Sequence, residues 1–431
     1  MEPKGMLKSS DDRKRLLLVS TRIFWPTDAG HKILLYHYCK GLYDHYHYDI
    51  YMYSFLEYDQ KTGEENKPYF IKRIFLAKQP RYLQIIGNIL VHSLFGKDRW
   101  SFQSALYYSG YNRKRIEELI RKIKPDAVMI DLDRLSRYDA ALKDFDGLKT
   151  IFMEDALSKR YIRQIRALRH DSGIGGRYER YLPGWVSRII NTRLLKSHIL
   201  KEESKRLEVE EVRAARSFDA LIYVNRYEAK EMNKRSGRNN AYTVTMGADC
   251  DYFSEKIDVP KIPNTLSFVG NLTVAANADS VRMIMDDIMP LIPGRPLIHF
   301  IGPVPDRLKE EYRDDPQCIF TGPVDDVRKY VKETMVILSP VAYGTGVKTK
   351  IIEGMAMGMP VVTNSLGIDG LSAVSGRDLL VSDDFGKMAD MAGRLLRDEE
   401  QRAKLGRNGY RYAASMHRWE DIYRVFGEIG F

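Results

Sequence analysis

The stretch Ser339–Leu371, SPVAYGTGVKTKIIEGMAMGMPVVTNSLGIDGL, decides which fold this sequence specifies. An apolar run, MVIL, comes just before it, and a second one, PVVT, lies inside it. Short apolar runs bounded by turn residues are typical of buried strands, and the segment between these two reads as a glycine-marked loop followed by a short helix. That segment contains the residues best suited to contact a ligand: Gly344, Gly346, Lys348, Lys350 and Glu353. A strand, helix, strand order predicts a parallel sheet covered by helices.

The loop and the start of the helix suit a phosphate or a diphosphate. Glycines let backbone amides approach a ligand closely, and the first N–H groups of a helix are unpaired and carry partial positive charge. Lys348 or Lys350 would add a full charge where a leaving diphosphate builds up its own. Glu353 lies one turn further on and suits hydrogen bonds from sugar hydroxyls. The alternative is a tight turn with a surface glutamate.

Similar apolar runs recur along the whole chain of 431 residues. We expect strands at 15–20, 48–54, 127–131, 150–153, 220–224, 265–269, 297–301, 318–320, 335–338, 360–363 and 379–381. Helical or glycine-marked segments follow most of these runs, and the length fits two domains. The sequence therefore predicts an α/β protein with two parallel sheets.

A proline-containing stretch, VPKIPN, follows the strand-like YTVTM and marks a domain boundary. The sequence ends with aromatic and aliphatic residues at helical spacing, which predicts a helix that crosses back to the first domain. The predicted order is a flexible N-terminus (1–14), a first domain (15–245) with a basic helical insertion (156–215), a second domain (246–409) and a C-terminal helix (410–431).

Composition excludes several protein classes. Apolar residues make up 44% and charged residues 29% of the chain, which argues against disorder and coiled coils. Only Cys39, Cys250 and Cys318 are present, without a CxxC pair, so we expect no disulfide framework and no cysteine-built zinc site. No structural metal and no cofactor are expected. No apolar run reaches the roughly 18 residues of a spanning helix, and residues 1–15 do not resemble a signal peptide. We therefore expect a cytoplasmic protein.

The net charge of +10 is concentrated in one half of the chain. Residues 226–431 have 27 Lys and Arg against 29 Asp and Glu, whereas residues 1–225 have 41 against 29. Such asymmetry indicates an anionic partner: nucleic acid, an acidic membrane surface or a phosphorylated ligand. The alternative is a basic solvated face without a partner. No nucleic-acid-binding motif is present, and nucleic acid is therefore not expected.

Two segments of the basic half are candidates for membrane contact. Residues 81–100 have apolar residues at helical spacing and basic flanks, and residues 159–206 have 13 Lys and Arg against four acidic residues. Basic amphipathic helices lie in the plane of anionic bilayers. The alternative is that their apolar stripes pack on the domain core. We expect peripheral contact with an anionic membrane, at its inner face.

The sequence GVKTKIIEGMAMGMPVVTNSLGIDGL resembles the donor-site signature of retaining glycosyltransferases of family 4, the group 1 glycosyltransferases. The resemblance covers residues 218–371 in order, through DALIYVNRYEAKEM, TVTMGADCDYF, LSFVGNLTVAANADSVRMI, LIHFIGPVP and CIFTGPVDDVRKYVKETMVILSPVAYGTG. It implies the GT-B fold, in which two Rossmann-like parallel-sheet domains face each other across a cleft. It also implies retaining, metal-independent transfer of a sugar from a nucleotide-diphosphate sugar to a hydroxyl acceptor that is lipid-linked or anionic, in cell-surface polysaccharide or glycolipid synthesis.

The resemblance also assigns residues to the donor site. The donor-binding set it implies is Gly270, Asn271, Gly302, Thr321, Gly322, Pro323, Val324, Gly344, Gly346 and Val347. Glu353 matches the second glutamate of the family's Glu-x7-Glu motif and implies ribose contacts. Thr345 stands where the first glutamate is expected, and the cations usual after the first strand of the domain are missing from NLTVAANAD. The hypothesis is that Lys348 and Lys350 replace those cations, and that Thr345 or nearby amides contact the sugar.

The first domain supplies candidates for the acceptor side. RLLLVSTRIFWPTDAGHKILLYHYCKGL is similar to the family's opening strand, loop and helix, with Gly30 and His31 at the helix start; a turn and a structural histidine are the alternative. Asp131 and Asp133 end a strand as Asp-x-Asp, a pattern that binds a divalent metal in GT-A enzymes. Here the pair is expected to face the acceptor or to cap a helix. Asp155, after the next strand, is an acceptor-side candidate or an N-cap.

Two other functions compete with glycosyl transfer. A nucleotide-sugar 2-epimerase of related fold would convert the donor without an acceptor. A catalytically inactive sugar-nucleotide-binding protein would bind the donor without turnover, with Thr345 as the sign of lost activity.

Overall fold

The computed structural model describes the chain except residues 1–12, 28–29, 57–63, 97, 167–192 and 345. The chain divides into two compact units. The first comprises Met1–Val244 and Tyr423–Phe431, and the second comprises Thr245–Ile422.

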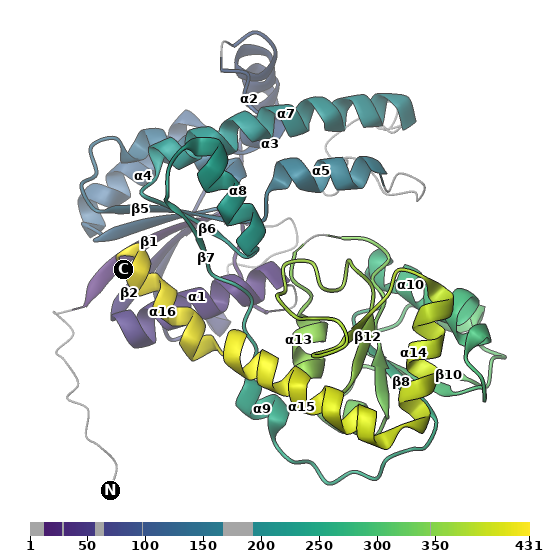
Figure 1. Cartoon of the computed structure of the whole chain (residues 1–431). Helices are drawn as coiled ribbons and strands as arrows, with labels where there is room; N and C mark the ends of the chain where they lie inside the picture. Colours follow the sequence, from purple (N-terminus) through teal and green to yellow (C-terminus); the bar gives the residue numbers. More distant parts are fainter. Residues whose placement is uncertain (1–12, 28–29, 57–63, 97, 167–192, 345) are drawn as a thin grey trace, which may run out of the picture. The chain divides into compact units, whose positions relative to one another are not determined.

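The first unit is built on a seven-stranded sheet in which every neighbouring pair of strands is parallel (Figure 1). Its strand order is β3-β2-β1-β4-β5-β6-β7. The strands are β1 (Lys14–Ser20), β2 (Tyr48–Ser54), β3 (Ile71–Leu76), β4 (Ala127–Asp131), β5 (Leu148–Glu154), β6 (Ala220–Tyr223) and β7 (Ala241–Thr243). The order reverses between β1 and β4, and the carboxyl ends of these central strands therefore meet where ligands bind in open α/β sheets.

Helices cover this sheet. They are α1 (Gly30–Tyr46), η1 (Glu64–Asn66), α2 (Tyr82–Asn88), η2 (Ile89–Leu94), α3 (Phe102–Tyr107), α4 (Gly110–Ile123), η3 (Asp133–Leu142), α5 (Leu157–Arg166), α7 (Arg193–Ser217), α8 (Arg226–Ser236) and α16 (Trp419–Ile429), whose part from Tyr423 onward belongs to this unit. Part of the predicted insertion 156–215 lies outside the described residues, and α5 and α7 form its described parts.

The second unit has a six-stranded parallel sheet of order β10-β9-β8-β11-β12-β13. The strands are β8 (Thr265–Val269), β9 (Leu297–Ile301), β10 (Cys318–Gly322), β11 (Val336–Leu338), β12 (Val361–Thr363) and β13 (Leu380–Val381). The helices are α9 (Cys250–Ser254), α10 (Ala275–Arg282), η5 (Met283–Ile288), η6 (Met289–Leu291), α11 (Asp306–Glu311), α12 (Val327–Lys332), α13 (Thr349–Ala356), α14 (Phe385–Arg397) and α15 (Glu399–Met416).

Burial on both faces explains why the central strands are continuous apolar runs. In β11, Val336 and Leu338 pack in one core cluster with Met388 of α14. Ile337 points to the other face, where an added Cβ on Gly354 of α13 would meet its Cδ1 at 2.6 Å. Strands covered on both sides need apolar residues at every position, which is the pattern that predicts them from sequence. The prediction of two parallel-sheet, Rossmann-like α/β domains is confirmed.

Two details differ from the sequence prediction. The C-terminal segment 410–431 is not one helix, because α15 ends at Met416 and α16 begins at Trp419. His417 breaks the helix: its Nδ1 lies 2.7 Å from the Met246 carbonyl oxygen, and its own carbonyl accepts the Ala248 N–H at 2.7 Å. The edge strand β3 was not predicted, since its sequence IKRIFL includes Lys72 and Arg73.

No helix in the described part of the chain combines the length and the apolar character that crossing a membrane requires.

Candidate functional site

Gly270, Gly302 and Gly322 lie together at the carboxyl edge of the second sheet and form a glycine strip, a surface without side chains. The Gly270 N–H donates to the Ile301 carbonyl at 3.0 Å, and the Gly302 N–H donates to the Gly322 carbonyl at 3.1 Å. A Cβ on Gly302 would lie 2.2 Å from the Gly270 oxygen, and the residue has φ 132°. Only glycine fits there. These three predicted donor-site residues are therefore brought together in space, across strands β8, β9 and β10.

Lys350 reaches this strip from α13. Its Nζ donates to Oδ1 of Asn277 at 3.2 Å, and it lies 4.0 Å from the centre of the Phe268 ring. Asn277 in turn donates through Nδ2 to the Asn271 carbonyl at 2.9 Å. The lysine is thereby fixed beside the residues that follow β8. The order of the second sheet reverses between β8 and β11, and this is where ligands bind in such sheets.

The charge of Lys350 is poorly compensated. Burial, together with the neighbouring charge of Lys348, lowers the pKa of Lys350 to about 7. Lys348 is the N-cap residue of α13 rather than part of the helix, and its Nζ donates to the Gly346 carbonyl at 2.6 Å. An anion bound here would raise the pKa of Lys350 again and make its charge favourable.

Glu353 is half-buried on the same helix. Burial raises the pKa of its carboxyl to about 7. Within the described ranges of the chain, no hydrogen bond or ion pair reaches this carboxyl, and the side chain stays partly exposed. A ligand that brings hydroxyl groups would satisfy it.

Two glycines of the loop before α13 have positive φ angles. Gly344 has φ 130° and Gly346 has φ 76°, both in the region that favours glycine. The N-cap residue Lys348 makes no side-chain capping hydrogen bond, and the first N–H groups of a helix suit an anion. Val347 is half-buried in this loop, and Thr345 lies outside the described residues.

The remaining donor-side candidates follow the edge strand β10. Thr321 donates through Oγ1 to the Gly322 carbonyl at 2.9 Å, while Pro323 is exposed and Val324 is half-buried. They belong to the same edge of the sheet as Gly302, which pairs with Gly322.

In the first unit, His31 forms two ion pairs. It lies in the first turn of α1, with Nε2 3.0 Å from Oδ1 of Asp131 and Nδ1 3.4 Å from Oε2 of Glu154. Its ring stacks on Phe152 at 5.5 Å between centroids. Burial opposes its charge, but the two carboxylates outweigh burial and raise the pKa of His31 to about 9. The histidine is therefore positively charged at neutral pH.

Asp131 is fully buried at the end of β4 and is held by further donors. Its Oδ2 accepts from Ser20 Oγ at 2.7 Å and from Thr21 N at 3.3 Å. Burial would raise its pKa, yet the charge and hydrogen bond of His31 keep the pKa below the ordinary value. The carboxylate is ionised, and it fixes the imidazolium beside it.

The backbone is strained next to this cluster. Leu132, just after β4, has φ 73°, and Glu154, at the end of β5, has φ 62°. Non-glycine residues adopt such angles at a cost, and they concentrate at functional sites. Two such residues beside His31 mark this sheet edge as a candidate site.

Asp133 and Asp155 occupy separate environments. Asp133 is buried at the start of η3, and burial raises the pKa of its carboxyl to about 8. Asp155 is ion-paired with Arg160, at 2.6 Å between Oδ1 and Nη2, and Arg160 also lies 3.6 Å from Glu154. Among the described residues, no group of three or more His, Cys, Asp or Glu is placed to hold a metal ion. Gly30 begins α1 and is exposed.

Sequence reasoning missed three residues that complete these clusters: Glu154, Arg160 and Asn277. Glu154 was visible as the residue before Asp155 in IFMEDALS. The sequence does not single out Asn277, because its contact with Lys350 depends on how closely α13 approaches α10.

Residues 263–398 match the family model described as glycosyl transferases group 1. No curated protein matches the chain. Among solved structures, Anabaena HepE in complex with UDP is similar, with a TM-score of 0.64 and 13% identity over 96% of this chain and 98% of that chain.

Two further structures are similar. The sucrose-phosphate synthase of Thermosynechococcus elongatus has a TM-score of 0.66 and 15% identity over 97% of this chain and 98% of its own. WaaG, a glycosyltransferase involved in lipopolysaccharide biosynthesis, has a TM-score of 0.57 and 14% identity over 96% and 99%. Residues 263–398 therefore resemble a group 1 glycosyltransferase domain, and the chain has the GT-B fold.

Proposed function

We propose that this protein transfers a sugar from a nucleotide-diphosphate sugar to a hydroxyl acceptor with retention of anomeric configuration and without a metal ion. The observation that carries the proposal is the position of Lys350 and its lowered pKa. This lysine is held by Asn277 next to the glycine strip, at the point where the second sheet reverses its strand order, and its pKa is lowered to about 7. The negative charge of a diphosphate would stabilise a cation at this position.

The donor would use the second unit. In this proposal Lys350, Lys348 and the amides of Gly344, Gly346 and Val347 hold the diphosphate and the sugar. Gly270, Asn271 and Gly302 leave room for the backbone to approach the ligand, and residues 321–324 bracket the base. The unpartnered carboxyl of Glu353 accepts hydrogen bonds from the ribose hydroxyls.

The reaction requires mainly positively charged groups that are held in position around the diphosphate. The bond between the anomeric carbon and the diphosphate oxygen breaks, and the acceptor oxygen forms a new bond to the same face of that carbon. The departing phosphate oxygen takes the acceptor proton, and no enzymic nucleophile is required. Lys350 and the start of α13 stabilise the negative charge that builds up on the diphosphate.

The acceptor would use the first unit. The His31–Asp131–Glu154 cluster combines fixed charges with backbone strain at the carboxyl ends of β4 and β5. We propose that it orients the acceptor hydroxyl from the start of α1, at Gly30, with Asp133 and Asp155 further along the same edge.

Two structural relatives support the substrate class. Anabaena HepE is described in complex with UDP-glucose, which supports a nucleoside-diphosphate sugar as donor. WaaG is described as involved in lipopolysaccharide biosynthesis, which supports a role in cell-surface glycolipid or polysaccharide synthesis.

A thermal-shift screen of nucleoside diphosphates tests the donor site first, because a ligand that binds only the folded state raises the melting temperature. We expect one nucleotide to stabilise the wild type, and Lys350→Met and Glu353→Gln to reduce that affinity at least tenfold. Exposed residues of the same unit provide matched controls: Lys309→Met and Glu310→Gln should leave the nucleotide affinity unchanged.

Product analysis then separates the three candidate functions. His31→Asn should keep nucleotide binding and lose transfer, because it belongs to the acceptor cluster. Conversion of the donor without any acceptor would instead indicate an epimerase, and binding without turnover across acceptors would indicate an inactive binding protein. Unchanged binding in both Lys350→Met and Glu353→Gln would refute the assigned donor site.

A further inference from the structure

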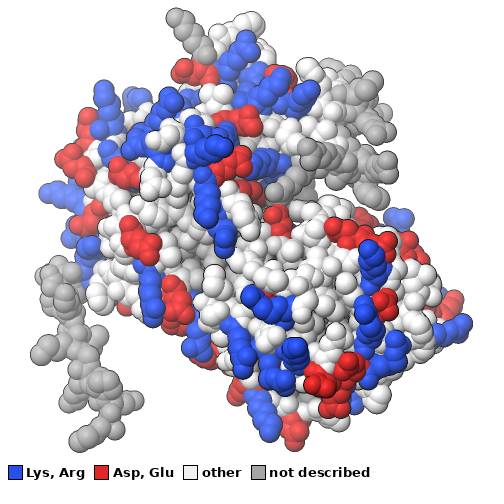
Figure 2. All heavy atoms as spheres, viewed as in Figure 1, with Lys and Arg blue, Asp and Glu red and all other residues white. Residues whose placement is uncertain are grey.

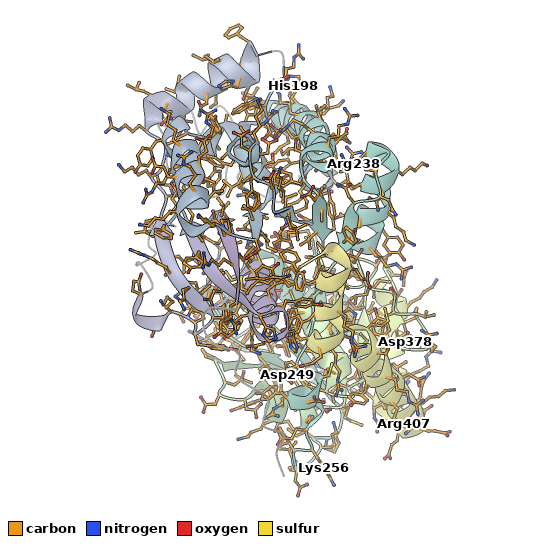
Figure 3. The ribbon with its side chains drawn as sticks, turned by 90° about the vertical axis from the view of Figure 1, so that its left-hand side faces the viewer. His198, Arg238, Asp249, Lys256, Asp378 and Arg407 are labelled. Atoms are coloured by element: carbon orange, nitrogen blue, oxygen red, sulfur yellow. The ribbon has the colours of Figure 1, made fainter. Side chains whose placement is uncertain are left out.

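The helical run formed by α2 and η2 exposes most of its apolar side chains. Residues 82–95, YLQIIGNILVHSLF, contain no charged residue. Leu83 is 81% exposed and Phe95 is 83% exposed. Five more large side chains of the run are exposed: Tyr82, Ile86, Leu90, Val91 and Leu94. Figure 3 shows this helix at the top of the view, with side chains that point away from the rest of the first unit.

The polar side of this run faces the protein. Asn88 donates through Nδ2 to the carbonyls of Ala105 at 3.0 Å and Tyr108 at 2.8 Å. The ring of His92 stacks on Trp100 at 4.1 Å. Arg206 of α7 donates to the Ser93 carbonyl.

These anchors orient the helix opposite to an ordinary surface helix, whose apolar stripe faces the core. The alternative considered from sequence, that the apolar residues of 81–100 pack on the core, is therefore wrong for this face. Exposed apolar patches of this kind mark contact with a partner or a membrane.

The sequence on both sides of the run is basic. Residues 67–116 include ten Lys and Arg but a single acidic residue, Asp98. Arg81 and Arg99 are exposed at the two ends of the run. Figure 2 shows Lys and Arg gathered over the upper part of the viewed face, over helices of the first unit.

We propose that the α2–η2 face is a docking surface for an anionic lipid bilayer. The helix would lie in the interface plane, with its seven exposed apolar side chains among the acyl chains and Arg81 and Arg99 at the headgroups. A second copy of the chain is the poorer occupant, because a symmetric contact would place the same basic flanks against each other. The inference does not depend on the proposed function.

Vesicle flotation tests the proposal with the full-length protein. The probe is one part phosphatidylglycerol to two parts phosphatidylcholine, compared with phosphatidylcholine alone. We expect wild-type protein to float with the anionic vesicles, and Leu83→Gln/Phe95→Gln to reduce the partition coefficient at least tenfold. Both side chains are exposed, so the fold should survive. Val209→Gln/Tyr227→Gln is the matched control, since it removes two exposed apolar residues elsewhere in the same unit.

Charge is tested separately. Arg81→Gln/Arg99→Gln should weaken flotation severalfold, and added salt should weaken it for the wild type. Wild-type protein that stays unbound, or a patch variant that floats as well as wild type, would overturn the proposal. A wild-type dimer that the patch variant converts to a monomer would assign the face to a second copy and would overturn it too. Nucleotide-induced thermal shifts should be equal in all these variants, so a failed donor site would be recognised independently.

Discussion

At the residue scale, the two titrating groups of α13 have opposite pKa shifts from the same cause. Burial lowers the pKa of Lys350 to about 7 and raises that of Glu353 to about 7. Each residue is therefore kept at a cost in stability, which is expected where a ligand supplies the missing partner. Sequence predicted both residues and their chemistry, whereas the desolvation that shifts their pKa values depends on packing.

This cost predicts opposite pH dependences of stability. Between pH 7 and 10.5 the unfolded state binds more protons than the folded state at Lys350, so its penalty is present below pH 7 and disappears as pH rises. Between pH 4.5 and 7 the folded state binds more protons at Glu353, so its penalty grows over this range and is complete above pH 7. We expect Lys350→Met to gain about 1–3 kcal/mol at about pH 6, and Glu353→Gln to gain a similar amount at about pH 8.

Urea unfolding checks this, at about pH 6 and about pH 10 for Lys350→Met and at about pH 4.5 and about pH 8 for Glu353→Gln. A gain that is the same at both pH values of a pair would show that packing, rather than charge burial, causes it.

At the element scale, the proposed donor site depends on the close approach of the turns after β8 and β9. Gly302 has no space for a side chain, because a Cβ would lie 2.2 Å from the Gly270 oxygen, whereas a Cβ on Gly322 would meet nothing within 4 Å. The sequence marks both positions only as glycines. Their different requirements follow from the register of neighbouring strands.

Gly302→Ala should therefore destabilise the protein more than Gly322→Ala. We expect about 2–3 kcal/mol for Gly302→Ala, from a forced backbone shift as well as an unfavourable φ of 132°. Gly322→Ala carries only the backbone strain of φ 71°, about 1–2 kcal/mol. Urea midpoints measure both, and nucleotide affinity should fall with Gly302→Ala. Equal losses of stability in the two variants would contradict a steric clash at Gly302.

At the scale of the whole molecule, the end of the chain completes the core of the first unit. Phe426 of α16 is fully buried, and its ring lies 5.4 Å from that of Tyr38 of α1. The Tyr46 hydroxyl of α1 donates to the Tyr423 carbonyl at 2.8 Å. The first unit thus depends on residues that are far from its strands in sequence.

Phe426→Ala should destabilise the first unit by about 3–5 kcal/mol, through lost burial and the cavity left behind. Hydrogen exchange resolves where the effect falls. Exchange should speed up in α1 and β1, while β8 to β12 of the second unit keep their protection. Faster exchange confined to the second unit would contradict the assignment of α16 to the first.

Sequence by itself determined the two parallel sheets and pointed to many residues of the proposed donor site. Runs such as RLLLVS and TLSFV are apolar on both faces, and this local pattern specifies a buried strand whatever lies around it. The glycine, lysine and glutamate pattern of the stretch before PVVT is equally local. It was sufficient to propose where a diphosphate would bind.

Only the tertiary structure decided which distant residues meet. The pairing of His31 with Glu154, the link from Lys350 through Asn277 to Asn271, and the break at His417 all join segments far apart in sequence. The outward apolar face of α2 and η2 is the clearest case. Helical spacing shows that a stripe exists, but the hydrogen bonds of Asn88 and Arg206 to other elements decide which side faces the protein.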